Sequence, residues 1–206
     1  MKENLLLIFV RNPELGKVKS RLAKSVGPKS ALDIYNFLLN HTKKVTEHVN
    51  ADKQIWYSNF IDQDDLWNAS VYKKNIQKKH EDLGVRMQYA FEKGFQQGYK
   101  NIIIIGSDMY DIATTEINTA FEKLKDKDAI IGPAEDGGYY LLGLTQIITP
   151  LFKNKTWGTE TVFKDSLIDL KNYILEQLET KNDVDYVEDI EHIPVFQSFL
   201  KTKQHD

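Results

Sequence analysis

The chain has 206 residues, a net charge of −3 and no cysteine; 41% of its residues are hydrophobic and 28% are charged. This length suits a single domain, residues 1–206, and the composition is typical of a soluble globular protein. The scattered charges argue against a nucleic-acid surface. The lack of cysteine excludes disulfides and thiolate metal sites, and it fits a reducing compartment.

The longest early apolar run, residues 5–10, is too short to cross a bilayer. It does not read as part of a signal peptide, because residues 11–17 supply neither a longer apolar stretch nor a small-residue cleavage site. We therefore expect a cytoplasmic protein with no membrane span.

Short apolar runs alternate along the chain with longer segments of helical period. The runs that predict strands are 4–10, 53–59, 75–79 (weakly), 101–106, 128–133 and 139–144. The segments that predict helices are 30–49, 82–98, 114–125, 159–170 and 187–201, whereas 173–178 fits either state. Asp82 is the expected N-cap of the second of these helices, and Thr114 or Thr115 that of the third.

This alternation predicts an α/β fold with a mostly parallel sheet covered on both faces. Ligands of such sheets bind beyond the carboxyl ends of the strands. The loops after Val10, Ile105 and Pro133 are therefore the first places to look for a site.

The loop after the first strand reads RNPELGKVKSRL, residues 11–22. Around Gly16 it carries four cations: Arg11, Lys17, Lys19 and Arg21. A glycine that lets the backbone approach, with cations beside it, suits a polyphosphate. It is not a Walker loop, because Val18 stands where Ser or Thr is required. The alternative is a solvated basic loop.

The stretch GSDMYD follows the most apolar strand and carries Asp108 and Asp111. Carboxylate oxygens near a polyphosphate suit Mg²⁺ or Mn²⁺. Asp108 is closer to the strand end and is favoured as the ligand, whereas Asp111 also fits the positive end of the next helix.

The stretch GPAEDGGYYLLGL, residues 132–144, is typical of a hairpin turn before a strand. The alternative is a wall of a ligand site, in which Gly137 and Gly138 let the backbone approach an acceptor. Asp136 would then bond the acceptor or act as a base.

Two weaker signals lie elsewhere: DLGVRM could aim a helix start at a phosphate or base, and Trp157 fits a stacking platform or the core. No histidine pair has zinc-ligand spacing, and no serine-hydrolase elbow is present.

Together these stretches resemble a bacterial family of glycosyltransferase-A-like proteins, the radical-SAM/selenodomain-associated transferase 1 type, in the nucleotide-diphospho-sugar transferase superfamily. The family pattern K-x-P-x-x-G-x-V-K-T-R-L reads RNPELGKVKSRL here, L-G-x-R-M reads LGVRM, and G-[ST]-D-C-P-D-L reads GSDMYDI. G-P-A-x-D-G-G-Y-Y-L-[IL]-G is unchanged, W-S-T-E reads WGTE, and D-V-D-T-x-E-D-L reads DVDYVEDI. Met109 and Tyr110 depart from the family's Cys-Pro, and Gly158 from its serine.

The resemblance implies a single-domain three-layer α/β/α sandwich with a mostly parallel sheet. It also implies a transferase that uses Mg²⁺ or Mn²⁺, a nucleotide or nucleotide-sugar, and a small-molecule acceptor. Similar sugar-acid cytidylyltransferases hold Mg²⁺ at positions that match Asp108 and Asp185. These two carboxylates are expected to repel each other when no metal is bound.

By the same resemblance, phosphate-binding residues would be Arg11, Gly16, Lys17, Lys19, Arg21, Gly84 and Arg86. Lys19 and Asp136 would be catalytic, and the acceptor would meet Asp111, Asp136, Gly137, Gly138, Trp157 and Thr159. The motifs do not separate glycosyl transfer from nucleotidyl transfer or from nucleotide binding without catalysis, since all three need the same phosphate contacts.

Overall fold

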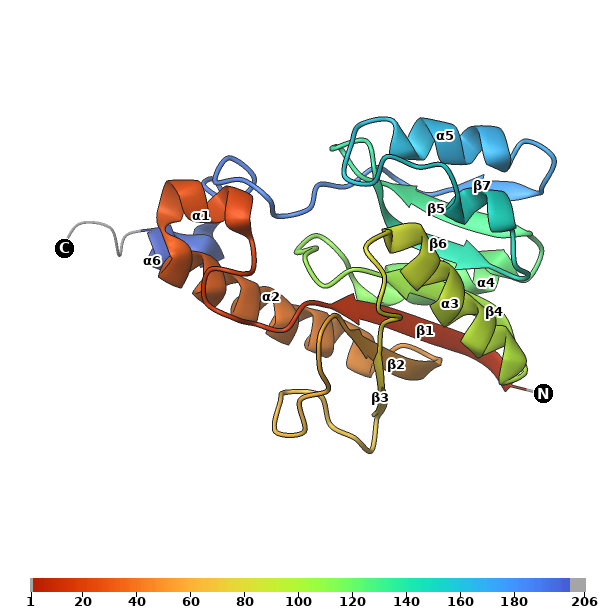
Figure 1. Cartoon of the computed structure of the whole chain (residues 1–206), viewed down its shortest axis with the longest axis horizontal. Coiled ribbons are helices and arrows are strands. Elements are labelled where there is room, and N and C mark those ends of the chain that lie inside the picture. Colours follow the sequence, from red (N-terminus) through yellow and green to blue (C-terminus); the bar gives the residue numbers. More distant parts are fainter. Residues whose placement is uncertain (1, 201–206) are drawn as a thin grey trace.

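The computed structural model describes residues 2–200 and shows seven strands in one sheet, in the order β3-β2-β1-β4-β6-β5-β7 (Figure 1). In chain order the strands are β1 (Lys2–Val10), β2 (Asp52–Tyr57), β3 (Tyr72–Ile76), β4 (Tyr99–Ile105), β5 (Ala129–Pro133), β6 (Tyr139–Leu144) and β7 (Leu175–Gln177). The predicted α/β class is confirmed.

The sheet is mostly parallel, with β6 reversed. β1 pairs in parallel with both β2 and β4, and β7 pairs in parallel with β5. β6 runs antiparallel to β4 and β5. The connection from β5 to β6 has only five residues, 134–138, which suffices for a hairpin but not for the crossover that a parallel pair needs.

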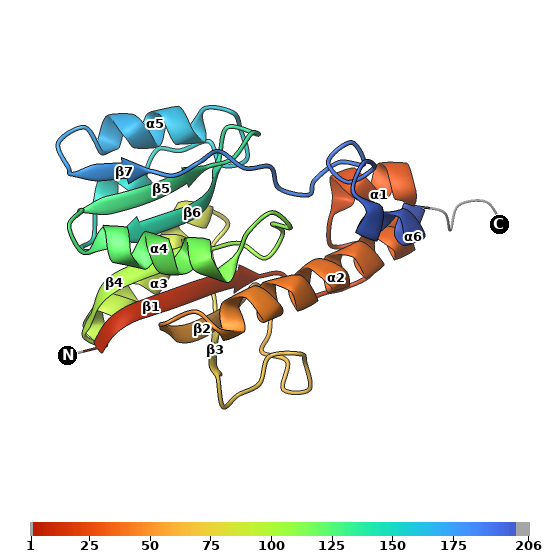
Figure 2. The same cartoon turned by 180° about the vertical axis from the view of Figure 1, so that it is seen from behind.

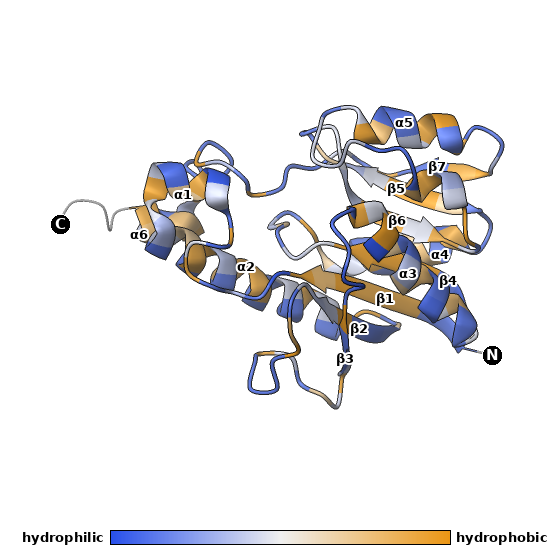
Figure 3. Ribbon diagram, viewed as in Figure 1, coloured by the Kyte–Doolittle hydropathy of each residue, from blue (hydrophilic) through white to orange (hydrophobic). Residues whose placement is uncertain are grey.

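Helices cover both faces of the sheet (Figures 1 and 2). One face carries α2 (Pro28–Glu47) and α4 (Thr114–Leu124); the other carries α3 (Leu83–Gln96), the 3₁₀ turn η1 (Thr149–Phe152) and α5 (Val162–Asp169). β1 supplies both cores, since Leu6 and Ile8 pack toward α2 while Leu5 and Leu7 pack toward α3. Figure 3 accordingly shows β1 as hydrophobic, whereas the helices alternate between hydrophobic and hydrophilic residues.

A third apolar cluster lies beyond the sheet, where α2 projects past the end of β1 (Figure 1). Here α2 packs against α1 (Ser20–Val26) and against the C-terminal turns η2 (Pro194–Phe196) and α6 (Gln197–Leu200). Leu22, Ile34 and Phe196 are fully buried in this cluster. The cluster anchors the C-terminal segment beside the loop that follows β1.

Most predicted elements are present, and Asp82 caps α3 as expected by accepting from the Val85 N–H at 3.0 Å. The uncertain segment 173–178 holds β7. The expected cap at Thr114 or Thr115 is wrong. The N-cap is Ala113, whose N–H donates to the Glu116 carboxylate, while the Thr114 hydroxyl reaches the Val45 carbonyl at 2.6 Å.

The prediction of a mostly helical segment 187–201 is also wrong for the described part of it. Only η2 and α6 are helical, and residues 187–193 form turns. Pro194 explains this, because a residue before proline is pushed out of the helical region, and Ile193 has φ −95° and ψ 116°. Lys201 lies outside the described residues. None of the helices within residues 2–200 has the length and apolar run that a membrane crossing needs.

Candidate functional site

A cavity of about 470 Å³ opens beyond the carboxyl ends of β1 and β4. Its charged lining consists of four cations, Arg11, Lys19, Arg21 and Arg86, and three carboxylates, Asp108, Asp136 and Asp185. These residues come from the loops after β1 and β4, the starts of α1 and α3, the β5–β6 hairpin and the C-terminal segment. The expected convergence of the loops after β1 and β4 at one sheet edge is confirmed.

Lys19 stands at the centre of this charged group. Its Nζ lies 3.1 Å from Asp108 Oδ2 and 3.0 Å from Asp185 Oδ1, and its side chain is only 5% exposed. Arg21 Nη1 approaches the other oxygen of Asp185 at 2.8 Å. The ammonium therefore bridges two carboxylates that are far apart in the sequence.

The electrostatic surroundings favour the charged forms of Lys19 and Asp108. Burial alone would lower the pKa of Lys19, but Asp108 and Asp185 outweigh it and hold that pKa above its usual value. Burial would likewise raise the pKa of Asp108, but the Lys19 ammonium holds it below the usual range. The expectation that Asp108 and Asp185 repel each other without a metal is thus wrong, because the Lys19 ammonium lies between the two carboxylates and neutralises their charge.

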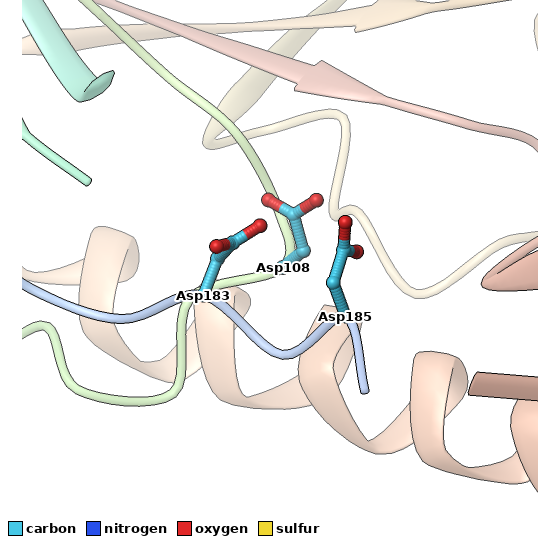
Figure 4. A group of neighbouring side chains, drawn as sticks. All are labelled: Asp108, Asp183 and Asp185. Carbon is cyan, nitrogen blue, oxygen red and sulfur yellow. The ribbon is translucent and has the colours of Figure 1, made fainter. Parts of the chain in front are cut away.

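A third carboxylate, Asp183, completes the acidic group. Ligand oxygens of Asp108, Asp183 and Asp185 all lie within 4.8 Å of one another, and Figure 4 shows the three side chains turned toward the same space. Burial, followed by the charges of Asp108 and Asp185, raises the pKa of Asp183 to about 7. Three carboxylates at this spacing are the hard oxygen donors that Mg²⁺ and Mn²⁺ prefer, so the residues fit a divalent ion.

The acidic segment is held in place by backbone contacts. The Val184 N–H donates to the Asp108 carbonyl at 3.2 Å, and the buried Val184 side chain packs into the third apolar cluster. The Asp189 carboxylate accepts from the N–H groups of Asp185 and Tyr186 at 2.8 and 2.6 Å. The late motif therefore contains one anchoring carboxylate, Asp189, besides Asp185, which lines the cavity, and Asp183, which belongs to the acidic group.

Arg11 and Arg86 form the basic side of the cavity. Burial and then the charge of Arg11 lower the pKa of Arg86, so the two guanidinium groups lie close enough to repel. Arg86 donates to Gln77 Oε1 at 3.2 Å, while its Nε is buried and, within residues 2–200, has no hydrogen-bond partner. Two like charges with an unused donor are an arrangement that an anion would stabilise.

The hairpin at residues 134–138 is both a turn and a wall of the cavity. Hydrogen bonds from Ala134 N to Gly138 O and from Gly137 N to Ala134 O close it, so the hairpin interpretation is confirmed. Asp136 lines the cavity and accepts from the Gly138 N–H at 2.8 Å. Gly137 has φ 86°, and a Cβ there would lie 2.3 Å from the Glu160 Cα.

Several residues singled out from the sequence do not line this cavity. Gly84 lets α3 pack closely, since a Cβ there would lie 2.3 Å from the Phe152 carbonyl oxygen. Trp157 donates to Asp82 Oδ1 at 3.2 Å and packs against the Tyr139 ring. The others outside the cavity lining are Gly16, Lys17, Asp111, Gly137, Gly138 and Thr159.

Three of these have local partners instead. Lys17 pairs with Glu14 at 2.6 Å, and Asp111 lies 3.4 Å from Lys181. The Thr159 hydroxyl donates to the Thr156 carbonyl at 2.7 Å. Their assigned binding roles stay predictions, without support from this arrangement.

The departures from the family pattern leave Asp108 in place. Met109 is buried in the core between the sheet and α2, and Tyr110 packs against the rings of Phe37, His41 and Phe196. Both side chains therefore serve packing. Gly158, which replaces the family serine, does line the cavity.

Sequence reasoning missed Asp183, Gln77 and Tyr35. The Asp-x-Asp spacing at 183 and 185 was the available signal for Asp183, because alternate residues of an extended segment point to the same side. Gln77 directly follows β3, so its position beyond the carboxyl end of a strand was the available signal. Tyr35 hydrogen-bonds both backbone groups of Arg11, at 2.9 and 3.1 Å, from within α2, and the sequence held no signal for that contact.

Residues 41–159, more than half of the chain, match the family described as uncharacterized proteins conserved in bacteria (DUF2064). The chain belongs to this family. No protein with a curated description matches it. The structure is similar to that of a Desulfovibrio desulfuricans G20 protein provisionally described as a nucleotide-diphospho-sugar transferase. That protein is 30% identical, with 98% of this chain and 90% of that one covered and a TM-score of 0.86.

Two solved structures of lower sequence identity share the fold of the present chain. A CMP:2-keto-3-deoxy-manno-octonic acid synthetase in complex with CTP is 12% identical, with 95% of this chain and 98% of that one covered and a TM-score of 0.57. Rv0371c from Mycobacterium tuberculosis H37Rv in complex with manganese is 11% identical, with 98% and 100% covered and a TM-score of 0.52. The expected nucleotide-diphospho-sugar transferase fold is confirmed.

Proposed function

We propose that this protein is a divalent-metal-dependent transferase that acts on a nucleotide-activated sugar. The observation that carries the proposal is the meeting of two opposite charge groups in one cavity. Arg11 and Arg86 line it together with Asp108 and Asp185, and a ligand oxygen of Asp183 lies within 4.8 Å of these two carboxylates. A diphosphate bound with a divalent ion needs both groups. The description of the similar Desulfovibrio protein supports the same choice of substrate.

The residues divide naturally into roles. Arg11, Arg86 and Arg21 would bind phosphate oxygens, with Lys19 at the boundary between the phosphates and the carboxylates. Asp108 and Asp185, with Asp183 beside them, would hold Mg²⁺ or Mn²⁺. Such an ion neutralises the negative charge that develops on the leaving phosphate.

In glycosyl transfer, the bond between the sugar carbon and the phosphate oxygen breaks, and the carbon bonds to the acceptor oxygen. The nucleoside diphosphate leaves. Asp136, on the hairpin wall, would accept the proton of the acceptor hydroxyl. Its contact with the Gly138 N–H fixes its orientation for that task.

Nucleotidyl transfer is the second candidate. The four cations that line the cavity suit the charge of a nucleoside triphosphate as well as that of a diphosphate. In that reaction an acceptor phosphate oxygen would attack the α-phosphorus, and pyrophosphate would leave. Binding of a nucleotide without turnover is the remaining alternative.

The test is a melting-temperature screen of nucleoside triphosphates and nucleotide-sugars with and without Mn²⁺, followed by product analysis of every compound that stabilises the protein. Release of a nucleoside diphosphate supports glycosyl transfer, and release of pyrophosphate supports nucleotidyl transfer. Stabilisation without any product supports a binding protein. If no nucleotide changes the melting temperature, the proposal is wrong.

A further inference from the structure

The Lys19 ammonium occupies the space between the two carboxylates that would hold the ion. Its Nζ is nearly equidistant from Asp108 Oδ2 and Asp185 Oδ1, at 3.1 and 3.0 Å. A divalent ion bound by the same oxygens would lie 2.0–2.6 Å from them, typically, and so would almost coincide with this ammonium. Lys19 and the ion therefore compete for one position.

We propose that Lys19 is a built-in counter-ion that closes the metal position in the free protein and opens it when a phosphate arrives. The ion then enters together with the phosphate-bearing substrate rather than before it. This inference rests on the proposed function, since it specifies the order in which that site is filled.

The surroundings of Lys19 favour such a movement. Its side chain has four rotatable bonds, so the ammonium can swing toward the cavity without a change in the fold. Arg11 lines the same cavity, and its charge acts on both Arg86 and Asp108, so a phosphate bound to Arg11 would offer the ammonium a new anion nearby. When Lys19 leaves, Arg21 still neutralises one oxygen of Asp185 at 2.8 Å.

The backbone of Lys19 fixes where the side chain starts. Lys19 has φ 46° and ψ 48°, a left-handed conformation that is unfavourable for a side-chain-bearing residue. It directly precedes α1, and its carbonyl accepts from the Ala23 N–H at 2.8 Å. The ammonium is thus aimed at the carboxylates by a defined backbone, and only the side chain needs to move.

Competition of this kind couples the two ligands. An ion that binds alone must displace Lys19 and leave a buried ammonium without its partners, which weakens binding. A phosphate that draws Lys19 away removes this penalty, so phosphate and ion each raise the affinity for the other by the same factor.

The experiment measures binding of Mn²⁺ alone to the full chain by isothermal titration and by electron paramagnetic resonance of the free ion. Wild type is compared with Lys19→Met, Lys19→Gln and, as a matched control, Lys24→Met, which removes an exposed lysine of α1. We expect the Lys19 variants to bind Mn²⁺ about tenfold or more tightly than wild type. Lys24→Met should bind like wild type. Lys19→Gln keeps a hydrogen-bond donor and serves if Lys19→Met does not fold.

Equal Mn²⁺ affinity in wild type and both Lys19 variants, or no binding in any of them, overturns the counter-ion role. The proposed function is tested separately by nucleotide binding to wild type. Tighter Mn²⁺ binding in the Lys19 variants, with no nucleotide bound by wild type under any condition, would support the counter-ion and overturn the transferase.

Discussion

The backbone N–H of Val184 donates to the carbonyl oxygen of Asp108 at 3.2 Å. This contact joins the loop after β4 to the C-terminal segment, which are distant in the sequence. Val184 is buried, and the aspartates on either side of it face the same space as Asp108 (Figure 4). One hydrogen bond and one buried side chain therefore set the spacing of the three carboxylates.

Asp108→Asn should lower the free energy of unfolding by about 1–2 kcal/mol in the presence of a chelator, because the buried Lys19 ammonium then loses a charged partner. The same variant should lose the stabilisation that Mn²⁺ plus a bound nucleotide gives wild type. Urea unfolding with chelator and with Mn²⁺ plus nucleotide measures both effects. Asp126→Asn, at an exposed turn, is the control. A variant as stable as wild type would show that the Lys19 pair adds nothing.

Arg11→Ala should weaken nucleotide binding about 10- to 100-fold, because a charged contact to phosphate is worth about 1.5–3 kcal/mol. Its unfolding free energy should change by less than about 0.5 kcal/mol, since Arg11 is exposed. Isothermal titration and urea unfolding measure the two quantities. Lys29→Ala removes an exposed charge of α2 and should alter neither. Unchanged affinity in Arg11→Ala would return the loop to its interpretation as a solvated basic segment.

Gly137→Ala should destabilise the protein more than Gly16→Ala. Both glycines have positive φ, 86° and 75°, so both substitutions carry the left-handed penalty of about 1–2 kcal/mol. A Cβ at Gly137 would also lie 2.3 Å from the Glu160 Cα, whereas nothing lies within 4 Å of a Cβ at Gly16. Thermal or urea unfolding compares the two. Equal losses would mean that the hairpin moves away from residues 158–161 at no energetic cost.

His41 should make wild type lose stability as the pH falls. Burial lowers its pKa, with Lys44 adding to the effect, and its Nε2 is buried beside the Tyr110 ring. The unfolded chain therefore takes up a proton near the ordinary pKa of about 6.5, which the folded chain resists, so stability present above pH 6.5 is lost below it.

The check is the unfolding free energy of wild type and His41→Gln at pH 7.5 and 5.5. Wild type should lose more between these values than the variant, by less than about 1.4 kcal/mol per pH unit. A variant that loses as much as wild type would show that other groups cause the dependence.

The sequence sufficed to predict that Lys19 and Asp108 lie at one edge of the sheet, but not that the Lys19 ammonium pairs with Asp108 and Asp185. Lys19 and Asp108 follow strands of a parallel sheet, and the carboxyl ends of such strands share one edge. The prediction for Asp185 rested on the resemblance alone, since the acidic stretch at residues 182–190 by itself favours a loop that caps the final helix. Its place beside Asp108 depends on Val184 and the third apolar cluster, which no local pattern reveals.

Other features depended on contacts between distant segments. Trp157 and Gly84 meet each other across the start of α3, so their packing outweighs any local sign of a binding role. α1 escaped prediction because it has only seven residues and directly follows a loop rich in charge. Short helices of this kind owe their stability to tertiary burial, here of Leu22, rather than to propensity.

The late position of Asp183 and Asp185 in the chain also has a consequence for biosynthesis. The chain leaves the ribosome with its N-terminus first. The acidic segment therefore emerges after β1, α2, β2, β3, α3 and β4. At about 5–20 residues per second, the stretch between Asp108 and Asp185 takes roughly 4–15 seconds to synthesise. During that interval the nascent sheet carries one of the three carboxylates and the lysine that pairs with it. The full acidic group that we propose to hold a divalent ion therefore exists only after residues 183–185 have been synthesised.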